Sequence, residues 1–147
     1  ELARGYVEDV GSRVRRLRDK LEKALLEAVP RAMVNGGEAE RLPNTASIAF
    51  EFVEGEAILL MMNELGICAS SGSACTSGSL EPSHVLRAMG VPFTAAHGSI
   101  RFSLSHYTTE EEIDRIIAAM PPLIERLRQM SPFWKQALEG ALCQTAP

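Results

Sequence analysis

The spacing of apolar residues predicts a long amphipathic helix at the start of the chain, over residues 3–29. Its apolar positions recur at alternating steps of three and four, which places them on one face of an α-helix. These positions are Val7, Val10, Val14, Leu17, Leu21 and Leu25. Pro30 ends the helix, because proline has no backbone N–H to donate to the preceding turn. Asn35 and the two glycines after it then indicate a turn.

Two segments alternate between apolar and polar residues, which predicts half-buried strands. The first runs from Ser47 to Phe52, with its large apolar side chains at positions 48, 50 and 52. The second runs from Ser99 to Leu104 with the same alternation, so Arg101 points away from the apolar face. A third, short strand is expected over Ile67–Ala69.

A second helix is predicted from Gly55 to about Leu65, because Ile58, Leu59, Met62 and Leu65 share one face. Gly66 is well placed to end it in a left-handed conformation. Another helix, of about two turns, is expected between Pro82 and Gly90, and residues 91–98 are expected to be irregular.

The last predicted helix begins at a capping box formed by Thr109 and Glu112. Its apolar periodicity continues across Pro121 and Pro122, where we expect the helix to be kinked or broken. Strands separated by helices, without an internal repeat, predict an α+β domain with a small sheet.

Composition limits the class of protein. A chain of 147 residues with 46% hydrophobic and 23% charged residues is typical of one soluble globular domain, and no apolar run is long enough to cross a membrane. The net charge of −4 disfavours nucleic-acid binding. The arginines between residues 13 and 18 are followed by acidic residues, which is typical of a solvated helix with ion pairs. Because the chain begins inside a helical pattern, we expect it to be a piece of a longer protein.

The cysteines indicate a reducing compartment. There are three, an odd number without tight pairing, and no signal peptide precedes them, so we expect no disulfide framework and a cytoplasmic location. Cys68 lies in a predicted strand and is expected in the core. Cys143 lies in a polar tail and is read as incidental.

The segment most informative for function is the loop at residues 70–79, where serine, glycine, alanine and threonine surround Cys75. A thiol in a polar, exposed loop would be oxidised unless it had a use, which argues for a reactive cysteine, while the spacing alone is equally consistent with an incidental cysteine in a linker. Metal ligation is not favoured, because no pairing of cysteines and histidines has the spacing of a zinc site.

Two phosphate-binding loops are also excluded. A thiol phosphatase needs an arginine six positions after the cysteine, but the residue at that position is Glu81. A phosphate-binding Walker loop is excluded by the spacing of the glycines.

Two readings from the residues alone remain open. The first is a cysteine hydrolase with His84, His97 or His106 as the base, for which no local signature exists. The second is a noncatalytic interaction domain that bears a thiol. His97 and His106 flank the strand that carries Arg101, although histidines at strand ends usually have a structural role.

Two stretches carry a resemblance to a known family. They are SSGSACTSGSLEPSHVLRAMG at 70–90 and HGSIRFSLSHYTTEEEID at 97–114. Both resemble the C-terminal part of NifS-type cysteine desulfurases, which have the class V aminotransferase fold. The segment SPFWKQALEGAL at 131–142 is similar to the corresponding segment of the nitrogenase-associated members. The resemblance covers nearly the whole chain and implies a small domain at residues 1–147, with a small, mainly antiparallel sheet and flanking helices.

The resemblance also implies roles for two residues. Cys75 matches the family nucleophile, whose thiolate takes sulfur from L-cysteine bound to pyridoxal 5'-phosphate, leaving a persulfide and releasing L-alanine. Arg101 matches the arginine that binds the substrate carboxylate, a task suited to its planar guanidinium. A serine and glycine loop would let the sulfur carrier move between the cleft and an acceptor.

The resemblance implies further parts that this sequence does not carry. The lysine, histidine and aspartate that hold the cofactor lie in a large domain upstream, and Lys20, Lys23 and Lys135 are not plausible replacements. This segment alone is therefore expected to be inactive. The family implies a homodimer, an iron-sulfur scaffold protein of the NifU type as sulfur acceptor, and a role in nitrogenase assembly. Residues 132–134, Pro-Phe-Trp, are read either as a docking patch for that acceptor or as a staple to the core.

Overall fold

A computed structural model describes residue 7, residues 10–71 and residues 83–137 of the chain. Cys75, Cys143 and Pro82 lie outside them. In the described part, no helix is both long and apolar enough to cross a membrane.

In the described residues, the sheet has three antiparallel strands, β1 (Ala32–Val34), β2 (Thr45–Phe50) and β3 (Ser99–Ser103), in the order β1-β2-β3. The predicted alternation in β2 and β3 is confirmed. Phe52 was wrongly placed in β2, because its φ of 66° turns the chain out of the sheet. β1 was not predicted. The strand expected over Ile67–Ala69 is also wrong, since the pairing there is a single bridge at Ser70.

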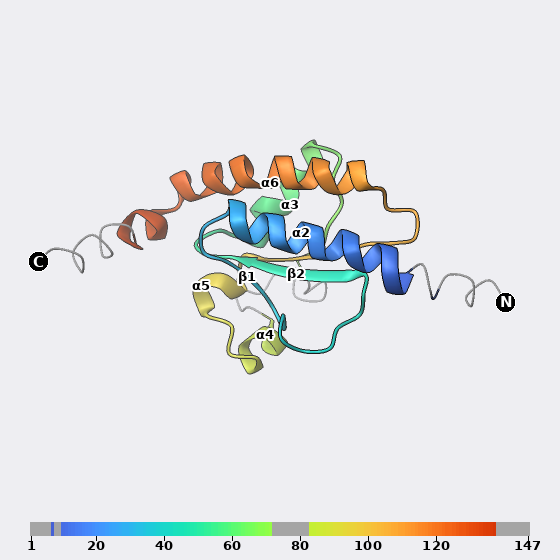
Figure 1. Cartoon of the computed structure of the whole chain (residues 1–147). Coiled ribbons are helices and arrows are strands. Elements are labelled where there is room, and N and C mark those ends of the chain that lie inside the picture. The colour runs from blue at the N-terminus through green and yellow to red at the C-terminus, as the bar shows by residue number, and fades with distance from the viewer. Residues whose placement is uncertain (1–6, 8–9, 72–82, 138–147) are drawn as a thin grey trace, which may run out of the picture.

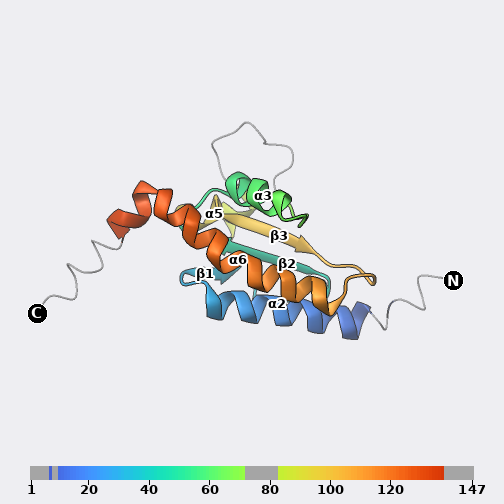
Figure 2. The ribbon, with the colours of Figure 1, turned by 90° about the horizontal axis from the view of Figure 1, so that it is seen from above.

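Three helices cover one face of the sheet (Figures 1 and 2). α2 (Arg15–Ala28) and α6 (Glu110–Met130) lie side by side, and α3 (Gly55–Glu64) packs against α6. The first helix ends before Pro30, as predicted. A single regular helix over 3–29 is wrong, however, because Val10–Val14 form a turn of π-helix, η1, ahead of α2.

α6 continues through Pro121 and Pro122, so the expectation of a break is wrong. Each proline costs a helical hydrogen bond, about 3 kcal/mol in a helix interior. Burial on both sides of the prolines offsets this cost, because Met120 and Ile124 are both fully buried. At the other end, the capping box is confirmed: Thr109 Oγ1 accepts from the backbone N–H of Glu112, whose carboxylate accepts from the N–H of Thr109.

The core lies between the sheet and this helical layer. The face of α2 contributes Val14, Leu17, Leu21 and Leu25, all predicted from the spacing. Val7 is exposed. The other large, fully buried apolar side chains come from the sheet, α3 and α6: Ile48, Phe50, Ile58, Met62, Ile100, Ile113, Met120 and Ile124. An α+β domain with a small antiparallel sheet is therefore confirmed.

Two short helices, α4 (His84–Ala88) and α5 (Phe93–Ala96), lie on the other side of the sheet (Figure 1). The segment 91–98 is thus not wholly irregular. α5 is held to the end of β2, because the N–H of Phe52 donates to the carbonyl of Thr94 at 3.0 Å. Gly66 and Gly90, at φ of 69° and 76°, follow α3 and α4 as the sequence predicted.

Candidate active site

Arg101 lies in the middle of β3 with its side chain exposed, while its neighbours Ile100 and Phe102 are buried on the opposite face. Its direct partner across the strand pair is Ser47 in β2. Directly paired residues in antiparallel strands project to the same face, with their Cβ atoms about 4.5–5.5 Å apart. The face of the sheet opposite the main helical layer therefore carries an arginine and a serine on directly paired residues.

The loop that contains Cys75 begins at Ser70, which is paired with Arg101. Outside the strands, Ser70 forms an isolated antiparallel bridge with Arg101. The N–H of Arg101 donates to the carbonyl of Ser70 at 2.6 Å, and the N–H of Ser70 donates to the carbonyl of Arg101 at 3.1 Å. Cys75 lies outside the described residues, so its role stays a prediction.

A polar network borders Arg101 on the same face of the sheet. Asn35, only 8% exposed, donates from Nδ2 to Ser47 Oγ at 3.1 Å and to Ser99 Oγ at 3.2 Å. Ser99 Oγ in turn donates to the carbonyl of Ala95 at 3.3 Å. Sequence reasoning had placed Asn35 only in a turn. Nothing in the sequence pattern around Asn35, a polar residue followed by two glycines, predicts that its side chain is buried against serines of the sheet.

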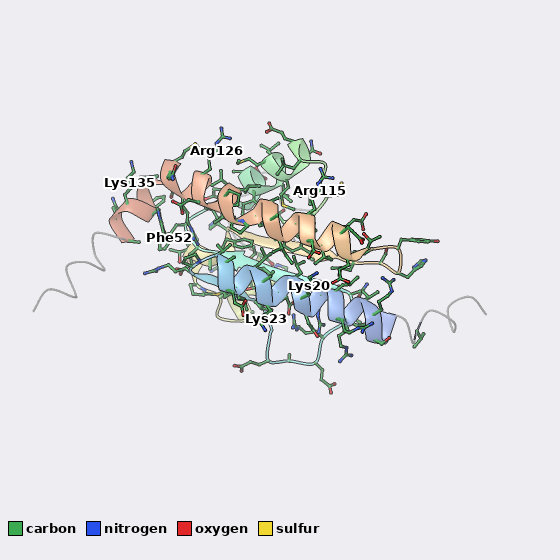
Figure 3. The ribbon with its side chains drawn as sticks, turned by 45° about the horizontal axis from the view of Figure 1, so that its top comes forward. Lys20, Lys23, Phe52, Arg115, Arg126 and Lys135 are labelled. Carbon is green, nitrogen blue, oxygen red and sulfur yellow. The ribbon has the colours of Figure 1, made fainter. Side chains whose placement is uncertain are left out.

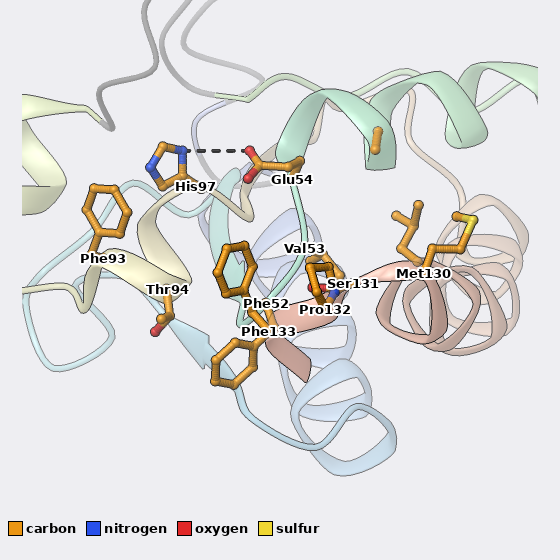
Figure 4. Close-up of a pocket in the computed structure, with 12 residues that line it drawn as sticks. Phe52, Val53, Glu54, Phe93, Thr94, His97, Met130, Ser131, Pro132 and Phe133 are labelled. Atoms are coloured by element: carbon orange, nitrogen blue, oxygen red, sulfur yellow. Dashed lines mark ion pairs between the residues drawn. The ribbon is translucent and has the colours of Figure 1, made fainter. Parts of the chain in front are cut away.

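A separate pocket of about 360 Å³ lies between the β2–α3 connection, α5 and the end of α6 (Figure 4). Apolar side chains dominate its wall, and neither Arg101 nor Ser70 lines it. His97 lines this pocket, with Nδ1 3.7 Å from Glu54 Oε2 and its ring at an edge-on 4.6 Å from that of Phe93. The structure therefore places His97 in an apolar pocket, apart from the site built around Arg101.

The other two histidines, His84 and His106, lie in separate parts of the domain. His84 begins α4 and is exposed. The backbone carbonyl of His106 accepts a hydrogen bond from Arg13, which also donates to the carbonyl of Thr108 at 2.9 Å. Arg13 thus ties the turn before α2 to the connection that leads into α6.

The described residues do not supply a lysine suited to hold an aldehyde cofactor. Lys20 Nζ is paired with Glu110 at 2.8 Å and Asp114 at 2.6 Å, and these hydrogen bonds raise the pKa of its ammonium. Lys23 and Lys135 are exposed on the surface (Figure 3). The same residues contain no group of three His, Cys, Asp or Glu side chains placed to hold a metal ion.

Two weaker sequence readings have clear outcomes. Cys68 is exposed, so its placement in the core is wrong: Ile67 turns inward and the next side chain faces outward. Trp134 packs against Phe52, with ring centroids 5.8 Å apart, and lies 4.5 Å from the guanidinium of the buried Arg128. These contacts favour the interpretation that Trp134 anchors its helix to the rest of the domain. Phe133, in contrast, is 65% exposed and lines the apolar pocket.

Comparison with known proteins matches residues 2–116 to the family described as "Aminotransferase class-V". The chain is 63% identical over 134 residues to the "Cysteine desulfurase" of Azotobacter chroococcum mcd 1, covering 91% of this chain and 34% of the relative. It is equally similar to "Cysteine desulfurase NifS" of Azotobacter vinelandii, covering 91% of this chain and 33% of that protein. The chain thus spans about a third of the length of these curated relatives.

The fold of the chain is also similar to that of solved NifS-like proteins. The X-ray structure of a NifS-like protein from Rickettsia africae ESF-5 superposes with a TM-score of 0.65 and 34% identity, covering 76% of this chain and 28% of that one. A second "NIFS-LIKE PROTEIN" has a TM-score of 0.68 and 30% identity, covering 86% of this chain and 30% of its own.

Proposed function

Because the chain belongs to the class-V aminotransferase family, we propose that it is the C-terminal small domain of a cysteine desulfurase. The complete enzyme would convert L-cysteine to L-alanine and take the sulfur as a persulfide on Cys75. The similarity to proteins named cysteine desulfurase over more than nine-tenths of the chain supports this proposal. The backbone pairing of Ser70 with Arg101 is the structural observation that carries it, because the first residue of the loop with the thiol is hydrogen-bonded to the residue that would bind the substrate.

Arg101 would bind the carboxylate of L-cysteine. Its exposed side chain stands on the polar face of β3, and a guanidinium can donate two parallel hydrogen bonds to a carboxylate. By binding the carboxylate, Arg101 would orient the amino acid so that its sulfur is available to the thiol of the loop at 70–79.

Cys75 would act as the nucleophile in the sulfur transfer. Its thiolate attacks the substrate sulfur, so an S–S bond forms while the C–S bond of the substrate breaks. The electron pair of that bond stays with the substrate's β-carbon, which takes up a proton to give alanine. Because a neutral thiol is a weak nucleophile, the reactive form is the thiolate.

Pyridoxal 5'-phosphate is the cofactor expected for the family, and the described residues do not fit it because their lysines are exposed or ion-paired. We propose that the rest of the polypeptide holds it, and that this chain alone does not turn over cysteine. The name NifS among the relatives supports sulfur delivery to iron-sulfur cluster assembly for nitrogenase, with a NifU-type scaffold as acceptor. A homodimer and a cytoplasmic location complete the proposal.

The proposal is tested by cysteine replacement in the full-length enzyme. Cys75→Ser should retain cofactor binding but abolish persulfide and alanine formation, since a hydroxyl is a poor nucleophile toward sulfur. Cys68→Ser and Cys143→Ser are the matched controls and should retain turnover. Mass spectrometry that located the persulfide on Cys68 or Cys143, or normal alanine release by the Cys75 variant, would contradict the assignment. Hydrolysis of acyl substrates by this chain alone would favour the hydrolase reading instead.

The role of Arg101 is tested in the same enzyme. Loss of hydrogen bonds to a charged group costs about 1.5–3 kcal/mol, which predicts a fall in kcat/KM of roughly ten to 150-fold for Arg101→Ala. Arg101→Lys should also be damaging, because an ammonium cannot form the planar pair of bonds. Near-normal kcat/KM in both variants would exclude the carboxylate role, and a large fall in thermal stability would assign Arg101 to the fold.

A further inference from the structure

We propose that Ser47 is a second hydrogen-bond donor to the substrate carboxylate beside Arg101, and that Asn35 is the positioning residue that leaves the Ser47 hydroxyl free to donate. This inference rests on the proposed function of Arg101. Ser47 is the direct cross-strand partner of Arg101 and is half-buried, whereas the arginine is exposed. The hydroxyl therefore lies closer to the sheet than the guanidinium does, and in this proposal the substrate carboxylate lies between the two groups.

The orientation of the Asn35 amide follows from its neighbours. Ser99 Oγ donates its hydrogen to the carbonyl of Ala95, so it has only lone pairs left for Asn35. The NH₂ group of Asn35 must therefore point toward Ser99, and the same group reaches Ser47 Oγ. A flipped amide would place an acceptor oxygen against Ser99, which has no hydrogen left to give.

This orientation determines what Ser47 can offer. A serine hydroxyl has one hydrogen and two lone pairs, and Asn35 occupies a lone pair. Within the described residues, no acceptor takes the hydrogen of Ser47. Oδ1 of Asn35 is buried and also has no hydrogen-bond partner among the described residues. The Asn35 amide therefore donates to both serines and accepts from neither of them. The network thus leaves a hydroxyl hydrogen available on the cross-strand partner of Arg101, and a hydroxyl together with a guanidinium suits a carboxylate.

The test uses the full-length enzyme with L-cysteine. Ser47→Ala should raise KM about tenfold and leave kcat within about twofold, because the bond is made equally in the ground state and the transition state. Ser47→Thr keeps the hydroxyl in a residue that suits a strand and should restore KM to within about threefold. Thr45→Ala is the matched control: Thr45 lies two residues away in β2 on the same face, pairs with Ser103 and should leave KM unchanged.

Asn35 is tested through its dependence on Ser47. Asn35→Asp keeps the side-chain shape but offers only acceptors, so it should draw the Ser47 hydrogen inward and raise KM about as much as Ser47→Ala. Asn35→Ala provides a second variant in case a buried carboxylate prevents folding. In a Ser47→Ala background, neither change should raise KM further. An equal rise with and without the Ser47 hydroxyl would overturn the positioning role.

A binding measurement separates this inference from turnover. Calorimetric titration of the loaded enzyme with L-alanine should show affinity about tenfold weaker for Ser47→Ala, while ethylamine, which has no acceptor in place of the carboxylate, should bind alike to both forms. If Arg101→Ala has normal KM, the proposed function of that residue fails. If Arg101→Ala is impaired and Ser47→Ala matches the unmodified enzyme, only the role of Ser47 is refuted.

Discussion

Replacing Gly98 by alanine should destabilise the domain strongly, because the backbone leaves no room for a Cβ atom. An added Cβ would stand 2.1 Å from the carbonyl oxygen of Phe50 and 2.9 Å from that of Val53. Both are main-chain atoms, so no flexible side chain can move aside. Gly98 also accepts a hydrogen bond from the N–H of Phe50 at 3.1 Å and leads directly into β3.

The magnitude follows from what must shift. Forcing extra volume into a packed region costs about 1–3 kcal/mol. Weakening the Phe50–Gly98 hydrogen bond adds about 1 kcal/mol. Phe50 is fully buried, so moving its backbone also disturbs the core. We therefore expect Gly98→Ala to lower the free energy of unfolding by about 3 kcal/mol, or Tm by about 6–12 °C for a domain of this size.

Urea titration followed by far-ultraviolet circular dichroism measures this change in the 147-residue chain. Gly11→Ala is the matched control, because no atom of the described residues, apart from the adjoining backbone, lies within 4 Å of its added Cβ. That variant should be neutral or stabilised by up to about 1 kcal/mol, since alanine favours helix over glycine. A free energy of unfolding for Gly98→Ala within about 0.5 kcal/mol of the unmodified chain would refute the close approach of Gly98 to β2.

Three further expectations concern the described elements. Thr109→Ala removes the cap of α6 and should cost about 1 kcal/mol by urea titration, whereas Thr109→Ser should cost far less. Arg128→Ala and Trp134→Ala should show a coupling of at least about 0.5 kcal/mol in a double-mutant cycle, because their contact is a cation–π interaction at 4.5 Å; additive effects would argue against it. Cys68 should react promptly with a thiol reagent in the folded chain, since it is exposed; protection until unfolding would contradict its placement.

Local patterns in the sequence were sufficient where neighbouring residues determine the structure. The alternation around Arg101 predicts β3 and the direction of its side chains, and the capping box from Thr109 to Glu112 predicts the start of α6. The apolar spacing likewise predicts the buried face of α2. In each case the signal and the structure lie within a few residues of one another.

The elements that were missed depend on contacts between distant residues. β1 has only three residues, too few to show alternation, and forms because β2 pairs with it. Helical propensity at Pro121 and Pro122 argues for a break in α6, and burial of the flanking residues outweighs it. Asn35 gains its place in the site from Ser99, 64 residues later in the chain.

The bridge between Ser70 and Arg101 fixes the start of the segment that contains Cys75 at the edge of the sheet. Cys75 follows Ser70 by five residues, and five residues span at most about 17 Å when fully extended. In the proposed reaction, the acceptor must therefore bring its receiving atom within roughly that radius of Arg101, where the substrate is also bound. If the proposed function holds, sulfur is taken up and passed on within the same region, and each residue inserted between Ser70 and Cys75 would widen the radius by about 3.4 Å.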